Sequence, residues 1–261
     1  MFKRGRVDMK LKGKNGYNIE CDKYIRQTDN VVVIAMHGFA GDKSSNCIKK
    51  LRLTMDSLNI GLITFDWPSH GESEVDGKYL TVDNCLNDLE IVYNYVKKIN
   101  PKSKIIAFST SFGGYITLLY NIKKEKKFDG IILRAPAIKM YDILMNNILD
   151  NDMLDSLKTK GYFNFGFERI MEVYDQFISD LKNNNIYDLY KTNIFNNIDI
   201  IHGTKDITVP IDDSIEFCKE NNLNLYRIEG ANHRFNLSGQ VEEVVGIAKN
   251  IIMQKYIVNK K

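Results

Sequence analysis

Short, continuous runs of apolar residues alternate along this chain with stretches whose apolar residues follow helical spacing. Continuous runs are typical of parallel strands that are covered on both faces. They predict buried strands at 31–36, 61–66, 104–108, 129–136, 198–202 and 223–228. Helices are predicted at 44–58, 81–98, from 115 onward, at 210–219 and at 238–256, with Ser44 and Thr81 as N-caps of the first two. This alternation predicts an α/β fold with a mostly parallel, twisted sheet flanked by helices.

Two regions depart from that alternation. Alternating residues at 5–12 and 17–26 surround Asn15-Gly16, a strong hairpin signal, and predict an antiparallel edge of the sheet. Residues 137–195 carry no strong parallel-strand signal. They contain helical patterns at 143–149 and 168–181, and an aromatic stretch at 161–167 that could form a small hairpin. We interpret 1–261 as one domain and 137–195 as an insertion over its sheet.

Composition and charge exclude several classes of function. The net charge of +3 over 261 residues gives no reason to expect nucleic acid or an anionic membrane as partner. The four cysteines lack any metal-binding spacing, and no signal peptide or long apolar run is present, so we expect a cytoplasmic protein with free thiols and no integral membrane segment. Phosphate-binding glycine motifs are missing, and neither a cofactor nor a metal is expected.

A candidate nucleophile lies between the strand at 104–108 and the helix that follows it. Ser111 is flanked by the small residues Ser109 and Gly113, two positions before and two after. A sharp strand-to-helix turn tolerates only small residues at those positions, and it exposes the hydroxyl at its apex. The usual pattern is G-x-S-x-G, and Ser109 replaces the first glycine here.

A serine nucleophile needs an imidazole base, and the imidazole needs a carboxylate to orient it. In folds built around such a turn, the three residues occur in the order serine, acid, histidine. This order selects Ser111, Asp206 and His233, because His202 precedes every acid in its own loop. Asp212 and Asp213 are the alternative acids, although they lie where a helix is expected to begin.

Acyl transfer also requires donors for the oxyanion. The backbone N–H of Phe112 follows the nucleophile, and the N–H of Phe39 lies in the loop after the strand at 31–36. We predict that these two groups form the oxyanion hole. His37 and Gly38 are also consistent with a tight turn around a buried histidine.

Five motifs together resemble the α/β-hydrolase superfamily, from about residue 31 to the C-terminus. They are His37-Gly38-Phe39, the segment 66–73, the segment 109–114, the segment 202–206 and the segment 230–235. The chain looks most like serine esterases that include the feruloyl (cinnamoyl) esterases, and it differs in having Ser69 where a glycine is common. The resemblance implies an α/β-hydrolase fold with a small cap insertion after the sixth strand, and hydrolysis of esters through an acyl-serine.

The resemblance also implies catalytic roles for three residues. Ser111 would be the nucleophile, His233 the general base and acid, and Asp206 its orienting acid. The aromatic residues Tyr162, Phe163, Phe165 and Phe167 are weaker candidates for the substrate pocket.

The expected partner is a small-molecule ester, either short-chain or hydroxycinnamoyl. A peptidase, a lysophospholipase or monoacylglycerol lipase, and a non-catalytic ligand-binding protein are the alternatives. The oligomeric state and any movement of the cap stay open.

Overall fold

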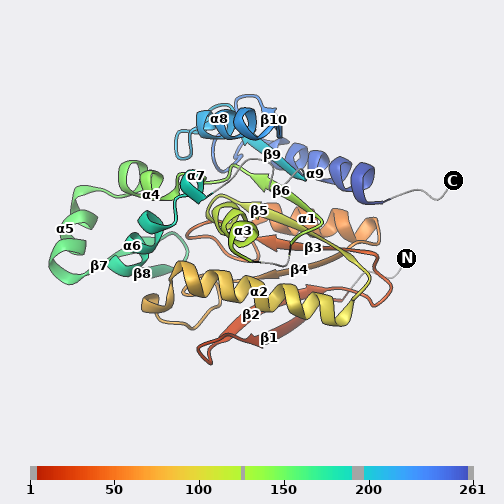
Figure 1. The fold of residues 1–261 in the computed structure, drawn as a ribbon, viewed down its shortest axis with the longest axis horizontal. Helices are drawn as coiled ribbons and strands as arrows, with labels where there is room; N and C mark the ends of the chain where they lie inside the picture. The colour runs from red at the N-terminus through yellow and green to blue at the C-terminus, as the bar shows by residue number, and fades with distance from the viewer. Residues whose placement is uncertain (1–4, 125–126, 190–196, 258–261) are drawn as a thin grey trace.

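A mixed sheet forms the centre of the protein, as seen in a computed structural model that describes residues 5–124, 127–189 and 197–257. Its eight strands lie in the order β1-β2-β4-β3-β5-β6-β9-β10 (Figure 1). Their bounds are β1 Val7–Lys12, β2 Asn18–Tyr24, β3 Val31–Met36, β4 Gly61–Phe65, β5 Lys104–Thr110, β6 Gly130–Arg134, β9 Ile198–Gly203 and β10 Asn224–Ile228. Every strand inferred from an apolar run is present in this sheet.

The pairing directions follow the sequence patterns. β1 and β2 form the predicted antiparallel hairpin, and β2 pairs antiparallel with β4. All other neighbours in the sheet are parallel. The chain runs from β3 outward to β4 and then returns to β5 on the other side of β3, so the connections diverge between β3 and β5. In open α/β sheets, ligands bind at such a divergence, beyond the carboxyl ends of the strands.

Helices cover both faces of the sheet (Figure 1). Their bounds are α1 Asn46–Ser57, α2 Val82–Ile99, α3 Phe112–Lys123, α8 Ile211–Asn221 and α9 Gln240–Tyr256, and a short 3₁₀ turn occupies Gly77–Tyr79. One apolar core holds side chains of α1 and α9, and a second core holds those of α2, α3 and α8. This arrangement and the parallel sheet confirm the predicted α/β class.

A side-chain cap was predicted for two of these helices, and the structure shows it for one of them. Thr81 caps α2 as predicted, because its hydroxyl accepts a hydrogen bond from the N–H of Asn84. The prediction for Ser44 is wrong, since α1 begins after Ser45. The backbone N–H and the hydroxyl of Ser44 both donate to Asp42 Oδ1, at 2.6 and 2.7 Å, so this serine closes a turn before the helix.

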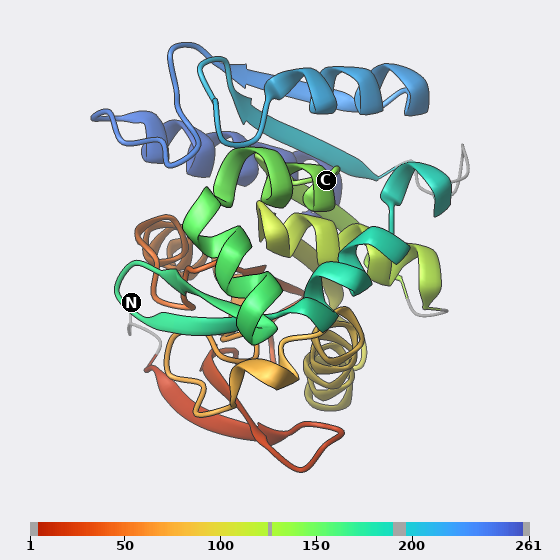
Figure 2. The same cartoon turned by 90° about the vertical axis from the view of Figure 1, so that its left-hand side faces the viewer.

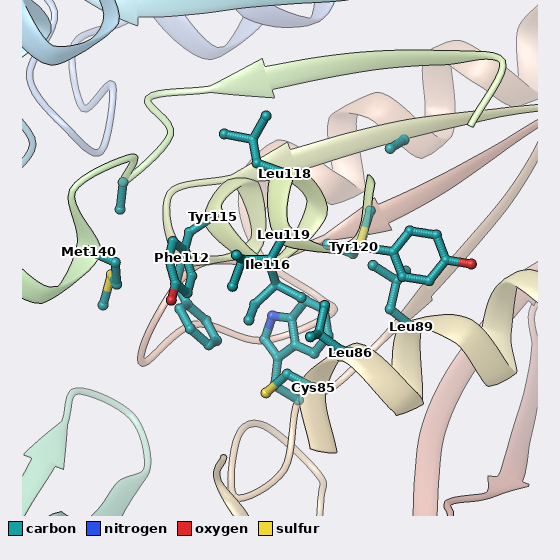
Figure 3. Close-up of a cluster of buried hydrophobic side chains, with 14 of the residues drawn as sticks. Cys85, Leu86, Leu89, Phe112, Tyr115, Ile116, Leu118, Leu119, Tyr120 and Met140 are labelled. Carbon is teal, nitrogen blue, oxygen red and sulfur yellow. The ribbon is translucent and has the colours of Figure 1, made fainter. Parts of the chain in front are cut away.

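The helix after the candidate nucleophile is buried along most of its length. Figure 3 shows Ile116 and Leu119 of α3 on the side of Leu86 of α2, whereas Leu118 points to the opposite side of the helix. A helix that is apolar on nearly all sides is held in place by packing rather than by its own propensity. This burial fixes the first turn of α3, which directly follows the candidate nucleophile. Among the residues that the structure describes, no helix is both long enough and apolar enough to span a bilayer.

The segment between β6 and β9 lies across one end of the sheet, at the left in Figure 1 and facing the viewer in Figure 2. It contains α4 Met140–Ile143, a π-helical turn Leu144–Ile148, α5 Asn151–Lys160, β7 Tyr162–Gly166, β8 Ile170–Tyr174, α6 Asp175–Asn183 and α7 Ile186–Leu189. It leaves the sheet after the sixth strand, as expected. Positions 190–195 of the predicted insertion lie outside the described residues.

Three local predictions in this segment need correction. The pattern at 168–181 predicts one helix, but its first half forms β8 and only its second half is helical. The stretch 161–167 does not form a hairpin alone, because it supplies β7, which pairs with β8. The pattern at 143–149 forms the end of α4 and a π-helical turn. Short apolar stretches fit the hydrophobic period of a helix and that of a strand equally well. Here β7 and β8 pair with each other and satisfy each other's backbone N–H and C=O groups.

A buried carboxylate makes the stability of this fold depend on pH. Asp88 of α2 accepts hydrogen bonds from the hydroxyl of Tyr17, at 2.9 and 3.0 Å, and its burial raises its pKa to about 7. The folded state therefore binds the proton more tightly than the unfolded chain. The resulting stabilisation is complete below the ordinary aspartate pKa of about 4 and is lost as the pH rises through 7.

We expect Asp88→Asn to flatten this pH dependence. The difference in unfolding free energy between variant and wild type should shift in favour of the variant by up to about 1.4 kcal/mol per pH unit between pH 4 and 7. Urea unfolding at pH 4.5 and pH 8 measures it, and any pH-independent cost of the buried amide cancels in that difference. Asp83→Asn, at an exposed site on the same helix, is the control. Equal pH dependence in Asp88→Asn and wild type would contradict this assignment.

Candidate active site

Ser111 lies at the apex of a sharp turn between β5 and α3. Its φ of +51° is in the region that side chains rarely adopt, and its carbonyl accepts hydrogen bonds from the N–H groups of Tyr115 and Ala137. The flanking small residues are required by their contacts. A Cβ on Gly113 would lie 2.6 Å from the carbonyl oxygen of His37, and the hydroxyl of Ser109 is buried 2.7 Å from that of Thr117. The replacement of glycine by Ser109 is therefore accommodated in the turn.

The structure brings the three predicted residues together from three separate loops. Ser111 Oγ lies 3.1 Å from His233 Nε2, and His233 Nδ1 lies 2.7 Å from Asp206 Oδ2. A carboxylate can only accept, so Nδ1 carries the proton and donates to Asp206. Nε2 is then free of hydrogen and accepts from the hydroxyl of Ser111. In this tautomer the imidazole can take the serine proton.

The carboxylate of Asp206 is held from several directions. Oδ1 accepts the N–H groups of Thr208 and Val209, at 3.0 and 2.8 Å, and Oδ2 faces His233 and His202. Burial alone would raise the pKa of Asp206, but the hydrogen bonds from His202, His233 and Val209 outweigh it and hold that pKa well below its usual range. Asp206 is therefore ionised at neutral pH.

Neither alternative acid reaches the imidazole. Asp213 forms an ion pair with Lys139 at 2.8 Å, and Asp212 is exposed in the first turn of α8. The geometry thus favours the acid that was selected from the order of the residues.

His202 also contacts Asp206, although the sequence patterns assigned it no role in the site. Its Nε2 lies 3.0 Å from the carbonyl oxygen of Val209 and 3.2 Å from Asp206 Oδ2, while its Nδ1 lies 2.8 Å from the hydroxyl of Ser214. Two acceptors face Nε2, so it carries the proton. His202 therefore contacts the same oxygen of Asp206, Oδ2, that accepts from His233. The sequence feature that could have indicated this contact is the position of His202 near the end of a strand, four residues before Asp206.

The loop that carries Phe39 passes directly beside the candidate nucleophile. A Cβ on Gly38 would lie 3.1 Å from the Cβ of Ser111. His37 holds this loop, because its Nδ1 donates to the carbonyl of Gly38 at 2.8 Å and its Nε2 accepts the N–H of Trp67 at 3.2 Å. Burial lowers the pKa of His37, which keeps it neutral. The buried-histidine turn is thus present, and it positions the backbone of Phe39.

A second loop supports the first. Asp66 accepts hydrogen bonds from the backbone and the side-chain ammonium of Lys43, at 2.7 and 2.8 Å, and from the N–H of Glu72 at 2.9 Å. Ser69 adopts a φ of +66°, which explains why glycine is common there, and it still completes the turn. A Cβ on Gly71 would collide with the carboxylate of Asp66. The motif at 66–73 is therefore structural.

A cavity of about 780 Å³ opens at Ser111 and His233. The segment between β6 and β9 contributes mainly apolar lining residues, Met140, Ile143, Ile148, Phe165 and Phe167, and Val209 from the loop after β9 also lines the cavity. Two of the predicted pocket residues do not line it. Phe163 is buried in the core, and the ring of Tyr162 lies 5.3 Å from that of Tyr174. Alternate residues of β7 face the core, so Phe165 reaches the cavity where β7 passes over Phe39.

Metal binding has little support from the side chains. Within residues 5–124, 127–189 and 197–257, no group of three histidine, cysteine, aspartate or glutamate side chains is arranged to hold a metal ion. The four cysteines are buried and free.

The mostly parallel sheet, the helices on both faces and the serine turn after β5 define an α/β-hydrolase fold. The profile of the family described as serine aminopeptidase S33 matches residues 27–160, and the chain belongs to this family. A search of curated proteins finds no significant match.

Solved structures share the fold at low sequence identity. Est1E from Butyrivibrio proteoclasticus with bound ferulic acid has a TM-score of 0.78 and 18% identity, over 96% of this chain and 100% of that one. Mouse alpha/beta hydrolase domain-containing protein 10 has a TM-score of 0.73 and 16% identity, over 95% and 99%. At these identities the likeness shows the fold.

Proposed function

We propose that this protein is a serine hydrolase that cleaves carboxylic esters through an acyl-serine intermediate. The observation that carries the proposal is the chain of contacts from Ser111 through His233 to Asp206, at 3.1 and 2.7 Å, at the opening of the cavity. Each residue would have the role that its protonation allows: nucleophile, general base and acid, and orienting carboxylate.

In the first half of the reaction, Ser111 Oγ attacks the ester carbonyl while His233 Nε2 takes its proton. The ionised Asp206 stabilises the imidazolium that forms. The oxyanion would be bound by the N–H groups of Phe39 and Phe112. Phe112 is the first residue of α3, where backbone N–H groups have no partner within the helix. His233 then protonates the departing alcohol and activates a water, which releases the acid.

The lining of the cavity favours an ester over the N-terminus of a peptide. An aminopeptidase must bind the substrate's ammonium group, which calls for a carboxylate. Among the described lining residues, Glu242 supplies the only carboxylate, and it is paired with Lys50. Phe165 and Phe167 offer flat apolar surface of the kind that suits a short acyl chain or a hydroxycinnamoyl ring. The proposed substrates are esters of these two kinds.

Covalent labelling tests the nucleophile without knowledge of the natural ester. A fluorophosphonate should react once per chain, and peptide mapping should locate it on Ser111. Ser111→Ala should remove the label, whereas Ser57→Ala at the exposed end of α1 should keep it. Labelling of another serine in the wild-type protein would refute the assignment.

A further inference from the structure

Two arginines flank His233 without a carboxylate partner. Arg134, at the end of β6, donates from Nη2 to the backbone carbonyl of His233 at 3.2 Å, and its guanidinium lies 4.5 Å from the ring centre of Phe235. The guanidinium of Arg234 lies 4.0 Å from the ring centre of Phe167. Both arginines line the cavity, and within the described part of the chain neither forms an ion pair.

Arg134 is the unusual member of this pair, because only 7% of it is exposed. Burial lowers its pKa, but a guanidinium stays protonated at any physiological pH. Its Nε is buried without a hydrogen-bond partner. Asp206 acts on it electrostatically, yet the hydrogen bonds of that carboxylate go to His202, His233 and the backbone. A buried cation without a paired anion is costly, and a site that keeps one is suited to bind an anion.

The start of α1 adds a second positive feature to the same wall of the cavity. Ser45, Asn46 and Cys47 line the cavity at the N-terminus of this 12-residue helix. No side chain caps this end, and its first turn contains no acidic residue. Cys47 is close enough to Arg134 for each to affect the other's pKa. The positive end of the helix dipole and the guanidinium therefore act on the same region.

The charges of the remaining lining residues do not cancel this field. Lys50 and Glu242 form an ion pair and neutralise each other. The two arginines are left as an excess of positive charge in the cavity. Arg134 is close to the start of α1, whereas Arg234 stacks on Phe167 of the apolar segment between β6 and β9.

We propose that Arg134 determines specificity by binding an anionic group of the substrate, a carboxylate or a phosphate, while the ester carbonyl lies at Ser111. This inference rests on the proposed esterase function and narrows it to esters that carry a negative charge close to the scissile bond. Arg134 lines the cavity, and its planar guanidinium carries N–H donors of the kind that form charge-assisted hydrogen bonds to a carboxylate or a phosphate.

Matched esters test the proposal. One pair differs in the acyl group, p-nitrophenyl butyrate against mono-p-nitrophenyl glutarate. The other differs in the alcohol, phenyl acetate against 4-carboxyphenyl acetate. For one of the two pairs, wild-type kcat/KM should be about tenfold or more higher for the anionic ester, as expected of a charge-assisted hydrogen bond. Arg134→Met should abolish this preference, measured within the variant as the ratio of kcat/KM for the anionic ester to kcat/KM for the neutral ester of that pair. Any loss that both esters share, through the hydrogen bond to the carbonyl of His233, cancels in this ratio.

Arg52→Met is the matched control. Arg52 is on the same side of the sheet, stacks on Tyr24 and does not line this cavity, so its loss changes net charge equally without touching the site. It should keep the preference. If Arg134→Met does not fold, Arg134→Lys should retain part of the preference. In the wild-type protein, glutarate or inorganic phosphate should inhibit p-nitrophenyl butyrate hydrolysis more strongly than glutaramide does. Whichever of the two anions inhibits more strongly shows whether the site prefers a carboxylate or a phosphate.

Failure of this inference is distinguishable from failure of the esterase proposal. Ser111-dependent hydrolysis with a preference for neutral esters, or with equal preference in wild type and Arg134→Met, would overturn the anion site alone. Absence of hydrolysis of every ester would overturn the esterase proposal. Calorimetric titration of Ser111→Ala with monomethyl glutarate and with inorganic phosphate then tests the site without turnover. Binding that is lost in Ser111→Ala/Arg134→Met supports the site, and absence of binding overturns it.

Discussion

Replacing Ser111 with alanine is expected to lower kcat for ester hydrolysis by about 10⁴-fold or more, to near the background rate. The hydroxyl is the group within 3.1 Å of His233 Nε2 that could attack a bound carbonyl. Without it, His233 could still activate a water, but no acyl-enzyme could form. Steady-state rates on p-nitrophenyl acetate and p-nitrophenyl butyrate measure the loss.

The fold should survive this change. The positive φ of Ser111 is maintained by the hydrogen bonds of its backbone and by the burial of α3, and neither needs the hydroxyl. Far-UV circular dichroism and the midpoint of thermal unfolding should therefore match the wild type. A folded variant that retains more than about a hundredth of wild-type kcat would show that Ser111 is not the nucleophile.

The buried strands and the grouping of Ser111, Asp206 and His233 could be predicted because each follows from a local rule. Continuous apolar runs identify strands that are buried on both faces, and loops at their carboxyl ends meet at one edge of the sheet. Chain order then leaves few choices for the acid and the base. The structure places these three side chains in contact, although they are up to 122 positions apart.

The segment over the sheet was harder to predict because its elements depend on each other. β8 was mistaken for a helix, since its strand conformation exists through pairing with β7. One contact of Asp206 could not be predicted for a similar reason. The sequence places His202 at a strand end, but its contact with Asp206 depends on how the loop to Val209 folds back. The pocket prediction was wrong for Phe163 because Phe163 and Phe165 share one face of β7, and only Phe165 lies where β7 passes over Phe39 at the cavity.

Asp206→Asn is the second change with a large expected effect, about 10⁴-fold in kcat at neutral pH. The two backbone N–H groups at Thr208 and Val209 would hold the amide oxygen in the place of Oδ1. The amide NH₂ would then occupy the place of Oδ2 and donate to His233 Nδ1. The proton of His233 would move to Nε2, where it faces Ser111 and prevents the imidazole from accepting the serine proton. Rates at pH 7 on the same p-nitrophenyl esters measure this loss.

Asp212→Asn is the matched control, because it makes the same chemical change at an exposed position of the neighbouring helix and should leave kcat unchanged. The fluorophosphonate reaction separates the two steps of the argument. Its rate should fall in Asp206→Asn together with kcat, since both need the serine to be activated, while its site should remain Ser111. If Asp212→Asn or Asp213→Asn lowered kcat more than Asp206→Asn, the orienting acid would have to be reassigned. The pairing of His233 with Asp206 would then be a structural contact, and the imidazole would need its carboxylate from the first turn of α8.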